Sequence, residues 1–204
     1  MQGKFITLEG IEGSGKSTSL QTITDYLDNL NIEFIVTKEP GGGPLGTDLR
    51  KILLDKQSVI TPEVELLLMM ADRKDHIDNL VLPNLQNGVW IISDRYLDSS
   101  YAYQGGGRQI DTSKIDLLTK LLNLPMPDLT LLFDLSPEMA LERAKKRSEL
   151  DRFESEPLAF HTRIRDAYKL LAQQDPNRFV LIDATKNLES VQSQVQNCIG
   201  EFTK

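Results

Sequence analysis

The sequence predicts an α/β fold in which a parallel sheet is flanked by helices on both faces. Short apolar runs rich in strand-forming residues alternate with segments whose apolar residues recur every three or four positions. One run, residues 89–94, is almost continuously apolar, as buried parallel strands are, and it ends in an acid. A glycine-rich stretch, residues 10–17, separates the first apolar run from the first helical pattern. Strands that alternate with helices favour a parallel sheet covered on both sides.

The first quarter of the chain predicts two strands and two helices. Residues 4–8 are a short apolar run of strand formers, and residues 20–30 carry leucine and isoleucine at helical spacing. A second strand is expected at residues 33–37. It ends at residues 39–44, where proline and glycine force a loop. Residues 45–54 then fit a short helix.

The remainder of the chain continues the alternation. Thr61 can cap a helix that has proline at its first position, and the helical pattern runs to about Leu85 with a bend near Pro83. Residues 89–94 and 129–135 are the next two strands. The remaining elements are helices at residues 137–146, around 165–173 and at 188–199, with a last strand at 179–183. Together these elements predict a central parallel sheet with five strands.

Composition excludes several classes of protein. The 204 residues suit one domain, and the net charge of -7 argues against binding to nucleic acid or to an anionic membrane as the main activity. No apolar run approaches the ~20 residues that span a bilayer, and the N-terminus leads into a strand and not into a signal peptide. The only cysteine, Cys198, cannot form an internal disulfide, which fits the reducing cytoplasm.

Residues 10–17 match the phosphate-binding loop G-x-x-x-x-G-K-[ST]. Its glycines let the backbone wrap closely around phosphates, and the backbone N–H groups form a nest for anions. A helix that begins near Lys16 adds its positive end, Lys16 itself can reach the β- and γ-phosphates, and the hydroxyl of Ser17 can bind Mg²⁺. The alternative interpretation is a glycine-rich turn without a ligand. The order of strand, loop and helix favours the nucleotide site.

Acidic and basic residues follow the strand at 89–94. Asp94 stands where such folds place the acid that holds Mg²⁺, directly or through water, although it could instead cap the next helix. Arg95 can form a forked contact with phosphate at this edge of the sheet, or a surface salt bridge. Arg50 and Arg73 are weaker candidates because most helical arginines are solvated. Asp134 also ends a strand, but we expect it to orient structure and not to bind metal.

Two further segments have polar groups suited to a nucleotide. In residues 98–108, Gln104 offers a donor and an acceptor to the edge of a pyrimidine and Tyr103 supplies a flat wall, while the alternative is a helix end closed by glycines. Residues 143–154 are locally basic. Mobile arginines there could neutralise charge during phosphoryl transfer, or the segment could be a solvated helix end. Neither His76 nor His161 has the spacing of a metal site, and Cys198 fits core packing.

These motifs together resemble bacterial thymidylate kinase over nearly the whole chain. The residues that carry the resemblance are the phosphate loop with Glu12, then Thr37-Lys38-Glu39-Pro40-Gly41-Gly42, Ala71-Asp72-Arg73, Asp94-Arg95-Tyr96, Ser99-Ser100 and Tyr103-Gln104-Gly105. The phosphate loop occurs in many families, whereas the combination of the Glu-Pro-Gly-Gly and Asp-Arg-Tyr motifs is much more specific.

The resemblance implies a P-loop kinase fold, with residues 1–204 forming one nucleoside monophosphate kinase domain and residues 143–155 or so a mobile lid. The implied activity is phosphorylation of dTMP to dTDP with ATP and Mg²⁺, in the synthesis of dTTP. A cytoplasmic homodimer is also implied, with ATP and dTMP as ligands and neither nucleic acid nor membrane as partner.

The resemblance also implies roles for individual residues. Glu12 would contact the 3′-hydroxyl of the acceptor, Arg50 and Arg95 its phosphate, and Arg73, Ser100 and Gln104 the thymine, while Tyr103 would disfavour a 2′-hydroxyl. Arg143 would pack on adenine. Because the loop lacks an arginine after Glu12, Arg152 is the best match for the catalytic arginine of the subtype that supplies it from the lid. The expected catalytic residues are Lys16, Arg95 and Arg152. The expected ATP-binding residues are Gly10, Glu12, Gly13, Ser14, Gly15, Lys16, Ser17, Thr18 and Arg143. The expected dTMP-binding residues are Glu12, Glu39, Pro40, Arg50, Met69, Arg73, Arg95, Ser100, Tyr103 and Gln104. The expected metal ligands are Ser17 and Asp94.

Two positions depart from the family pattern. Met69 stands where a phenylalanine usually stacks on thymine, although its polarisable sulfur can still cover a ring. Lys38 replaces an arginine, which keeps the charge and loses the fork. Two other activities stay open: a related kinase that acts on another nucleoside or nucleoside monophosphate, and a GTPase-like nucleotide switch that acts through partners. The sequence lacks the Asn-Lys-x-Asp motif that reads guanine, since residues 185–187 lack the acid, and this argues against the switch.

Overall fold

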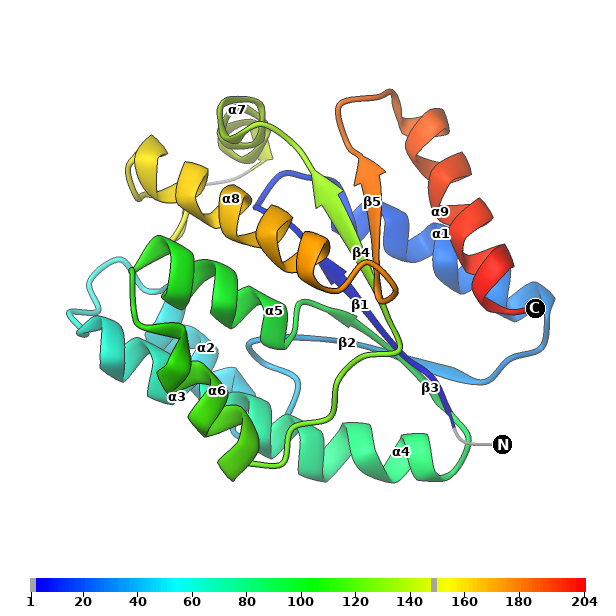
Figure 1. The fold of residues 1–204 in the computed structure, drawn as a ribbon, viewed down its shortest axis with the longest axis horizontal. Helices are drawn as coiled ribbons and strands as arrows, with labels where there is room; N and C mark the ends of the chain where they lie inside the picture. The colour runs from blue at the N-terminus through cyan, green and yellow to red at the C-terminus, as the bar shows by residue number, and fades with distance from the viewer. Residues whose placement is uncertain (1–2, 148–149) are drawn as a thin grey trace.

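The protein is built around one parallel sheet of five strands in the order β2-β3-β1-β4-β5 (Figure 1). The computed structural model describes residues 3–147 and 150–204. The strands are β1 (Phe5–Glu9), β2 (Phe34–Lys38), β3 (Trp90–Asp94), β4 (Leu129–Asp134) and β5 (Phe179–Asp183). Each lies within one residue of its predicted position at either end, so the predicted fold class is confirmed.

Strand register brings the polar strand ends to one edge of the sheet. Asp94 at the end of β3 pairs in register with Leu8 of β1 and with Lys38 of β2. On the other half of the sheet, Asp134 of β4 pairs with Asp183 of β5. Since all strands run in the same direction, the loops that leave their carboxyl ends lie together, and this is where α/β sheets bind ligands.

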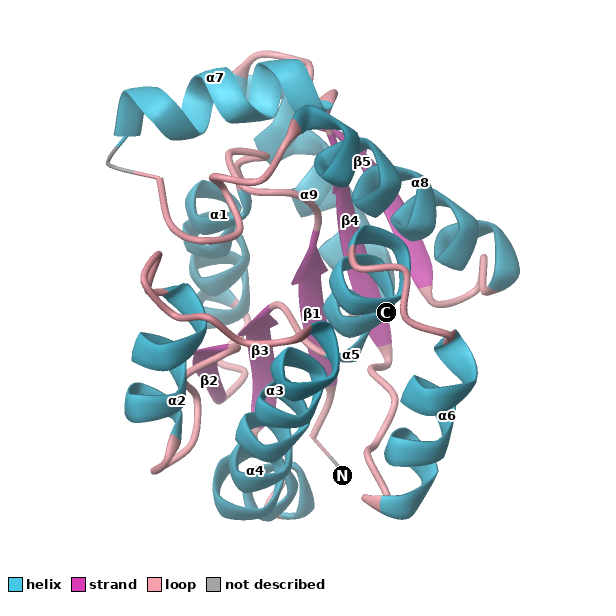
Figure 2. Cartoon of the chain, turned by 90° about the vertical axis from the view of Figure 1, so that its left-hand side faces the viewer, coloured by secondary structure: helices cyan, strands magenta, loops and turns pink. Residues whose placement is uncertain are grey.

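The helices form a layer on each face of the sheet. The α-helices are α1 (Lys16–Asn29), α2 (Gly46–Leu54), α3 (Pro62–His76), α4 (Leu82–Gln86), α5 (Leu97–Ser100), α6 (Thr112–Leu121), α7 (Pro137–Arg147), α8 (Leu158–Gln174) and α9 (Leu188–Phe202), and the π-helical segments are η1 (Ile77–Val81) and η2 (Tyr101–Gly107). Helices α1 and α9 pack together on one side of the sheet, and α3, α4, α5 and α8 lie on the other (Figures 1 and 2). Within the described residues, no helix is long and apolar enough to cross a membrane.

Alternate strand residues pack into two clusters. Ile6 and Leu8 of β1 are fully buried with Ile23 of α1 and Val195 of α9. Phe5, the neighbour of Ile6 in the same strand, belongs instead to the second cluster, with Leu66 and Met70 of α3 and Leu97 of α5. This period of two along a strand covered on both faces accounts for the nearly continuous apolar runs of the sequence.

The helical pattern differs from expectation at two places. Helix α6 was absent from the predicted elements, although Asp111 caps it by accepting a hydrogen bond from the backbone N–H of Ser113 and Ile115 buries its inner face. The helix expected from Thr61 to about Leu85 is present as α3, η1 and α4 in succession. The wider π-helical turn ends just before Pro83, whose missing N–H interrupts regular α-helical hydrogen bonding.

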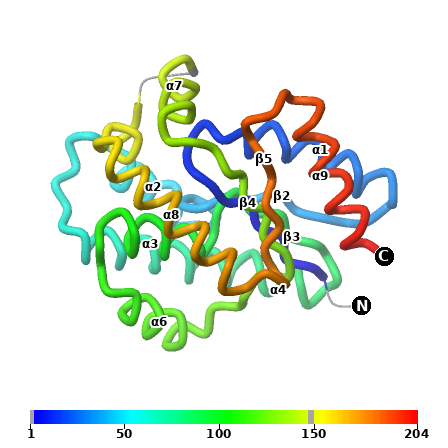
Figure 3. Tube along the Cα trace, turned by 45° about the horizontal axis from the view of Figure 1, so that its top comes forward, coloured from blue at the N-terminus to red at the C-terminus, as the bar shows by residue number. Residues whose placement is uncertain are grey.

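Two minor predictions are confirmed. Asp134 has a structural role and joins β4 to α8, because Arg165 of α8 donates hydrogen bonds to both of its carboxylate oxygens, at 2.6 and 2.9 Å. Cys198 packs against the core from α9. The chain trace in Figure 3 shows α7 rising above the carboxyl ends of the strands, close to the start of α8.

Candidate active site

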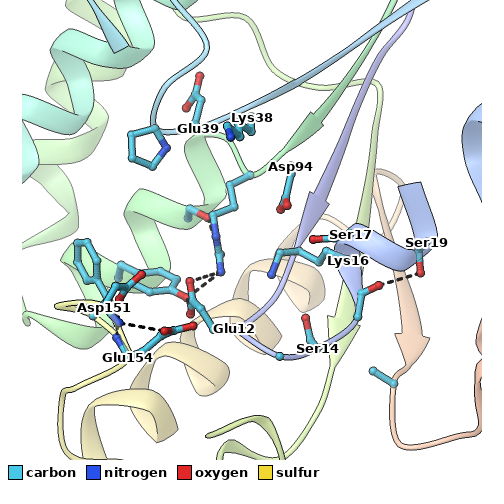
Figure 4. Close-up of a pocket in the computed structure, with 18 of the residues that line it drawn as sticks. Glu12, Ser14, Lys16, Ser17, Ser19, Lys38, Glu39, Asp94, Asp151 and Glu154 are labelled. Atoms are coloured by element: carbon cyan, nitrogen blue, oxygen red, sulfur yellow. Dashed lines mark hydrogen bonds and ion pairs between the residues drawn. The ribbon is translucent and has the colours of Figure 1, made fainter. Parts of the chain in front are cut away.

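A cavity of about 680 Å³ lies at the carboxyl edge of the sheet. Its walls come from the phosphate loop and the start of α1, the ends of β2 and β3, helices α2, α3 and α7, the α5–η2 region, segment 184–191, and residues Asp151, Phe153 and Glu154. Figure 4 shows Glu12, Lys16 and Asp94 facing one space, with Lys38 and Glu39 at one end and Asp151 and Glu154 beside Glu12. Residues from every motif that the sequence singled out therefore line this one cavity.

The phosphate loop is shaped by glycines with positive φ. Gly10 has φ 134° and Gly13 has φ 76°, which L side chains rarely adopt. A Cβ on Gly10 would lie 2.6 Å from the carbonyl oxygen of Phe133, and one on Gly13 would lie 2.4 Å from that of Ala140. The loop then enters α1 at Lys16, so the positive end of this helix faces the cavity. Residues 12–19 line the cavity, whereas Gly10 lies behind them and fixes the turn.

Lys16 lies across the loop. Its ammonium donates to the carbonyl oxygens of Gly10 at 3.0 Å and Ile11 at 3.1 Å. Burial and the nearby Arg95 lower the pKa of Lys16 to about 8, although the carboxylates of Asp94, Glu12 and Glu9 oppose the shift. A phosphate placed on the loop would add negative charge and favour the protonated amine.

Asp94 and Ser17 offer oxygen atoms for a hard cation. The Oδ1 atom of Asp94 is buried and has no hydrogen-bond partner among the described residues, while the side chain of Ser17 is exposed at the start of α1. No group of three or more acidic, histidine or cysteine residues in the described part of the chain could hold a metal by itself. One or two protein oxygens with substrate phosphates and water are how Mg²⁺ is usually bound, so the residues fit this ion.

Arg95 and Glu12 form an ion pair in the middle of the cavity. Arg95 donates to Glu12 at 2.6 Å and to the hydroxyl of Tyr103 at 3.0 Å, and Tyr103 in turn donates to Glu12. Burial would raise the pKa of Glu12, but Arg95 and Lys16 outweigh it and hold the pKa at about 2. Arg95 has φ 74°, a strained conformation for this residue type. The predicted phosphate-binding arginine and the predicted sugar-binding carboxylate therefore contact each other directly.

A buried carboxyl group supports Arg95 from behind. Glu9, at the end of β1, accepts hydrogen bonds from the hydroxyls of Ser99 at 2.6 Å and Tyr168 at 2.7 Å. Both hydroxyls also accept hydrogen bonds from Arg95. Burial and the nearby Asp98 raise the pKa of Glu9 to about 7. None of the predicted roles included Glu9 or Tyr168. Glu9 could have been noticed as an acid that ends an apolar strand, whereas Tyr168 lies on α8, far away in sequence.

A second network closes the end of the cavity near β2. Arg73, only 2% exposed, donates to Glu39 at 2.7 Å and to the hydroxyl of Ser100 at 2.8 Å. His76 holds the other oxygen of Glu39 at 2.8 Å, which gives this histidine a structural role in place of metal ligation. Arg50 donates to the carbonyl oxygen of Pro40 at 2.6 Å. These contacts fix the loop that follows β2.

The structure brings nearly all predicted site residues into this cavity. Those that line it are Glu12, Gly13, Ser14, Gly15, Lys16, Ser17, Thr18, Glu39, Pro40, Arg50, Met69, Arg73, Asp94, Arg95, Ser100, Tyr103, Gln104 and Arg143. Arg143 is exposed on α7, and it donates to the carbonyl oxygen of Ala184 at 3.2 Å. Lys38, one of the two departures from the family pattern, lines the cavity too.

Arg152 does not line the cavity in this conformation. Its guanidinium donates to Glu65 at 2.7 Å and to the carbonyl oxygen of Leu53 at 2.7 Å, and its Nη2 is buried without a partner among the described residues. It lies over the ring of Phe153, with its carbon Cζ 4.4 Å from the ring centre. Residues 148 and 149 of the predicted lid lie outside the described part of the chain.

Comparisons with known proteins agree with the geometry. The family model described as thymidylate kinase matches residues 8–195. A thymidylate kinase of Carboxydothermus hydrogenoformans is 48% identical over 195 residues, 94% of either chain, and one of Nitrosomonas europaea is 43% identical over 98% of this chain and 94% of its own. A crystal structure of thymidylate kinase from Ehrlichia chaffeensis has a TM-score of 0.79 at 31% identity and covers 98% of this chain and 99% of its own.

Proposed function

This chain belongs to the thymidylate kinase family, and we propose that its cavity holds ATP and dTMP end to end, with their phosphates meeting at Arg95. The chain is a kinase that phosphorylates dTMP to dTDP with ATP as the donor. The ion pair between Arg95 and Glu12 is the single observation that carries the placement. It joins the phosphate loop directly to the side chains expected to hold the acceptor.

The donor side consists of the phosphate loop and the start of α1. Backbone N–H groups of residues 13–18 and the ammonium of Lys16 would bind the β- and γ-phosphates. Ser17 and Asp94 would hold Mg²⁺, which would neutralise phosphate charge when bound with ATP. Arg143 would cover the adenine from α7.

The acceptor side lies between β2, α3 and η2. Arg50 and Arg95 would hold the phosphate of dTMP, and Glu12 would accept a hydrogen bond from its 3′-hydroxyl. Arg73, Ser100 and Gln104 would face the thymine, with Glu39 and Pro40 shaping the same end, and Tyr103 would restrict the space for a ribose 2′-hydroxyl. Met69 would cover the ring. All of these residues line the one cavity.

Catalysis then depends on position and charge. Phosphoryl transfer requires the attacking oxygen, the transferred group and the leaving oxygen to be nearly in line, and the protein stabilises the charge that spreads over the transferred group. Lys16 is already buried, the side chain of Arg95 is only 13% exposed, and hydrogen bonds orient both of them, so neither must reorganise far.

We assign the third catalytic cation to Arg152, as in the subtype whose arginine comes from the lid. In this conformation it points toward Glu65, so a rearrangement of the segment around residues 143–155 must bring it to the phosphates. Closure of that segment would also exclude water and limit hydrolysis of ATP.

An acceptor profile tests the proposed activity. ADP release, coupled to a spectroscopic readout, is measured with ATP and Mg²⁺ over dTMP, dUMP, dGMP, AMP and CMP. We expect dTMP to have the highest kcat/KM and dTDP to form in step with ADP. Preference for another monophosphate would identify a kinase with a different acceptor. Turnover of GTP that needs no acceptor would support a GTPase-like switch.

Met69→Phe tests whether this side chain covers the base. Stacking between two aromatic rings contributes about 0.5–1.5 kcal/mol beyond the buried area, so we expect dTMP to bind about 2- to 13-fold more tightly, as measured by calorimetry. Leu66→Met is the matched control, because Leu66 of the same helix is 3% exposed and belongs to the second core cluster. An unchanged Kd for dTMP in Met69→Phe would remove residue 69 from the base site.

We further propose that residues 1–204 act as one nucleoside monophosphate kinase domain in a cytoplasmic homodimer that serves dTTP synthesis, without nucleic acid or membrane as partner. Exposed leucines on two neighbouring helices support the dimer: Leu67 on α3, and Leu117 and Leu121 on α6. An ion pair at 3.8 Å between Lys114 and Glu63 joins these helices. Sedimentation equilibrium checks the proposed homodimer. A monomer at micromolar concentration would contradict it.

A further inference from the structure

Glu65 connects three polar side chains beside the acceptor end of the cavity. It lies on α3, its side chain is 1% exposed, and it does not line the cavity. Its Oε1 accepts a hydrogen bond from the amide nitrogen of Gln104 at 2.9 Å. Its Oε2 accepts one from Arg152 at 2.7 Å, and Arg108 lies within 3.2 Å of both oxygens. A buried carboxylate with such partners is held in one orientation.

The hydrogen-bond partner of a carboxylate must be a donor, and this fixes the orientation of the side-chain amide of Gln104. An ionised carboxylate can only accept hydrogen bonds, whereas a glutamine amide has one donating and one accepting end. If the amide were reversed, its carbonyl oxygen would face the carboxylate of Glu65 in a buried place, which is repulsive. The NH₂ group of Gln104 therefore faces Glu65, and its carbonyl oxygen makes no hydrogen bond within residues 3–147 and 150–204.

That carbonyl oxygen is the polar atom that Gln104 has left for a ligand. Gln104 is 1% exposed, and it lines the cavity beside Ser100 and Arg73. We propose that Glu65 is a positioning residue that sets base specificity, by holding Gln104 with its acceptor toward the base so that the site selects a pyrimidine with a ring N–H. This inference rests on the proposed placement of dTMP. Thymine and uracil carry such an N–H, whereas cytosine has an acceptor at the same ring position.

Removal of the charge of Glu65 should reverse this preference. In Glu65→Gln, Arg108 favours a carbonyl oxygen at the position of Oε2, also after Arg152 has moved to the phosphates, and this turns the new NH₂ group toward Gln104. The amide of Gln104 must then rotate to present its oxygen to residue 65 and its NH₂ group to the base. The variant thus offers a donor where the wild-type protein offers an acceptor.

The comparison of dUMP with dCMP isolates this effect, because the two nucleotides differ only at the base edge. We expect the dUMP to dCMP ratio, measured both as kcat/KM and as Kd by calorimetry, to fall by about 10- to 100-fold in Glu65→Gln, the cost of an unmade buried hydrogen bond. Some preference for dUMP over dCMP should remain, because Arg73 also faces the base. The ratio is independent of the fraction of folded enzyme, so a merely structural loss would leave it unchanged.

Two further variants serve as controls. Arg108→Lys keeps a cation near Glu65 and leaves the acceptor for Gln104 in place, so its ratio should match that of the wild-type protein. The exchange Glu65→Gln with Gln104→Glu keeps the total charge and again places an acceptor toward the base, so it should restore a wild-type preference for dUMP. This exchange also tests the inference if Glu65→Gln alone does not fold.

The possible outcomes distinguish a failure of the role of Glu65 from a failure of the proposed function. An unchanged ratio in Glu65→Gln, or an exchange variant that prefers dCMP, would overturn the role of Glu65. A wild-type protein that turns over neither dTMP nor dUMP would instead overturn the proposed function, since no acceptor would then lie against Gln104.

Discussion

Lys16→Ala is expected to lower kcat/KM for ATP by about 10³-fold, the range found when one preorganised charge is lost from a phosphoryl-transfer site. Lys16 is 7% exposed and is the loop cation that faces Glu12 and Asp94 in the described cavity. Its removal takes away the cation of the phosphate loop and leaves the β- and γ-phosphates there with backbone N–H groups and the bound Mg²⁺. Steady-state ADP release checks the expectation. Lys74→Ala is the control and should change kcat/KM less than about 2-fold, because Lys74 is a surface lysine of α3 that pairs with Asp78 of η1.

The lowered pKa of Lys16 predicts that the affinity for ATP depends on pH. The pKa of Lys16 lies at about 8 in the free protein, and phosphate binding favours the protonated form, so ATP binding takes up a proton above that pH. We expect the Kd for ATP to rise only about 2-fold from pH 7 to 8 and then by up to about 10-fold per pH unit. Calorimetry in two buffers with different ionisation enthalpies detects the proton directly. The same rise in Lys16→Ala would assign the effect to another group.

Arg152→Ala is expected to lower kcat by about 10³-fold and to change the Kd for ATP little, as for an arginine that acts mainly in the transition state. The structure raises a specific alternative, because Arg152 also ties the segment after α7 to Glu65 of α3 and to the carbonyl oxygen of Leu53. Single-turnover kinetics and thermal unfolding on the same variant separate the two roles. Near-normal kcat together with a lowered Tm would leave Arg152 as an anchor only.

Arg152→Lys sharpens that test. Lysine can keep one contact with Glu65 but cannot form the forked contact with a phosphoryl group. If catalysis needs the fork, kcat stays low in this variant while its Tm recovers toward that of the wild-type protein.

The sequence predicted the parts of the fold that depend on local pattern. Strand runs such as residues 89–94 and the loop at 10–17 carry their own signals, in apolar continuity and in glycines with positive φ at Gly10 and Gly13. Helix α6 was missed although Asp111 and Ile115 provide a cap and a buried position. Its sequence follows residues 98–108, where the pattern indicates either polar groups for a nucleotide or a helix end closed by glycines, and the helix that comes next was not considered.

Long-range partners could not be predicted in the same way. Nothing near Glu65 in sequence indicates that its carboxylate meets Gln104, Arg108 and Arg152, the last of them 87 positions away. The sequence around Glu65 shows only that a glutamate stands on an apolar helix face. The pairing of Arg95 with Glu12 likewise depends on how β1 and β3 lie side by side, which places their carboxyl ends together.

If donor and acceptor occupy one cavity with their phosphates meeting at Arg95, a single bisubstrate compound should fill both sites. In such a compound, adenosine and thymidine are joined through their 5′-oxygens by a polyphosphate chain. Calorimetry should give one molecule bound per chain, with an affinity above those of ATP and dTMP and a large loss of affinity in Arg95→Ala. Binding no tighter than that of ATP, with dTMP still able to bind beside the compound, would contradict this arrangement of the two nucleotides.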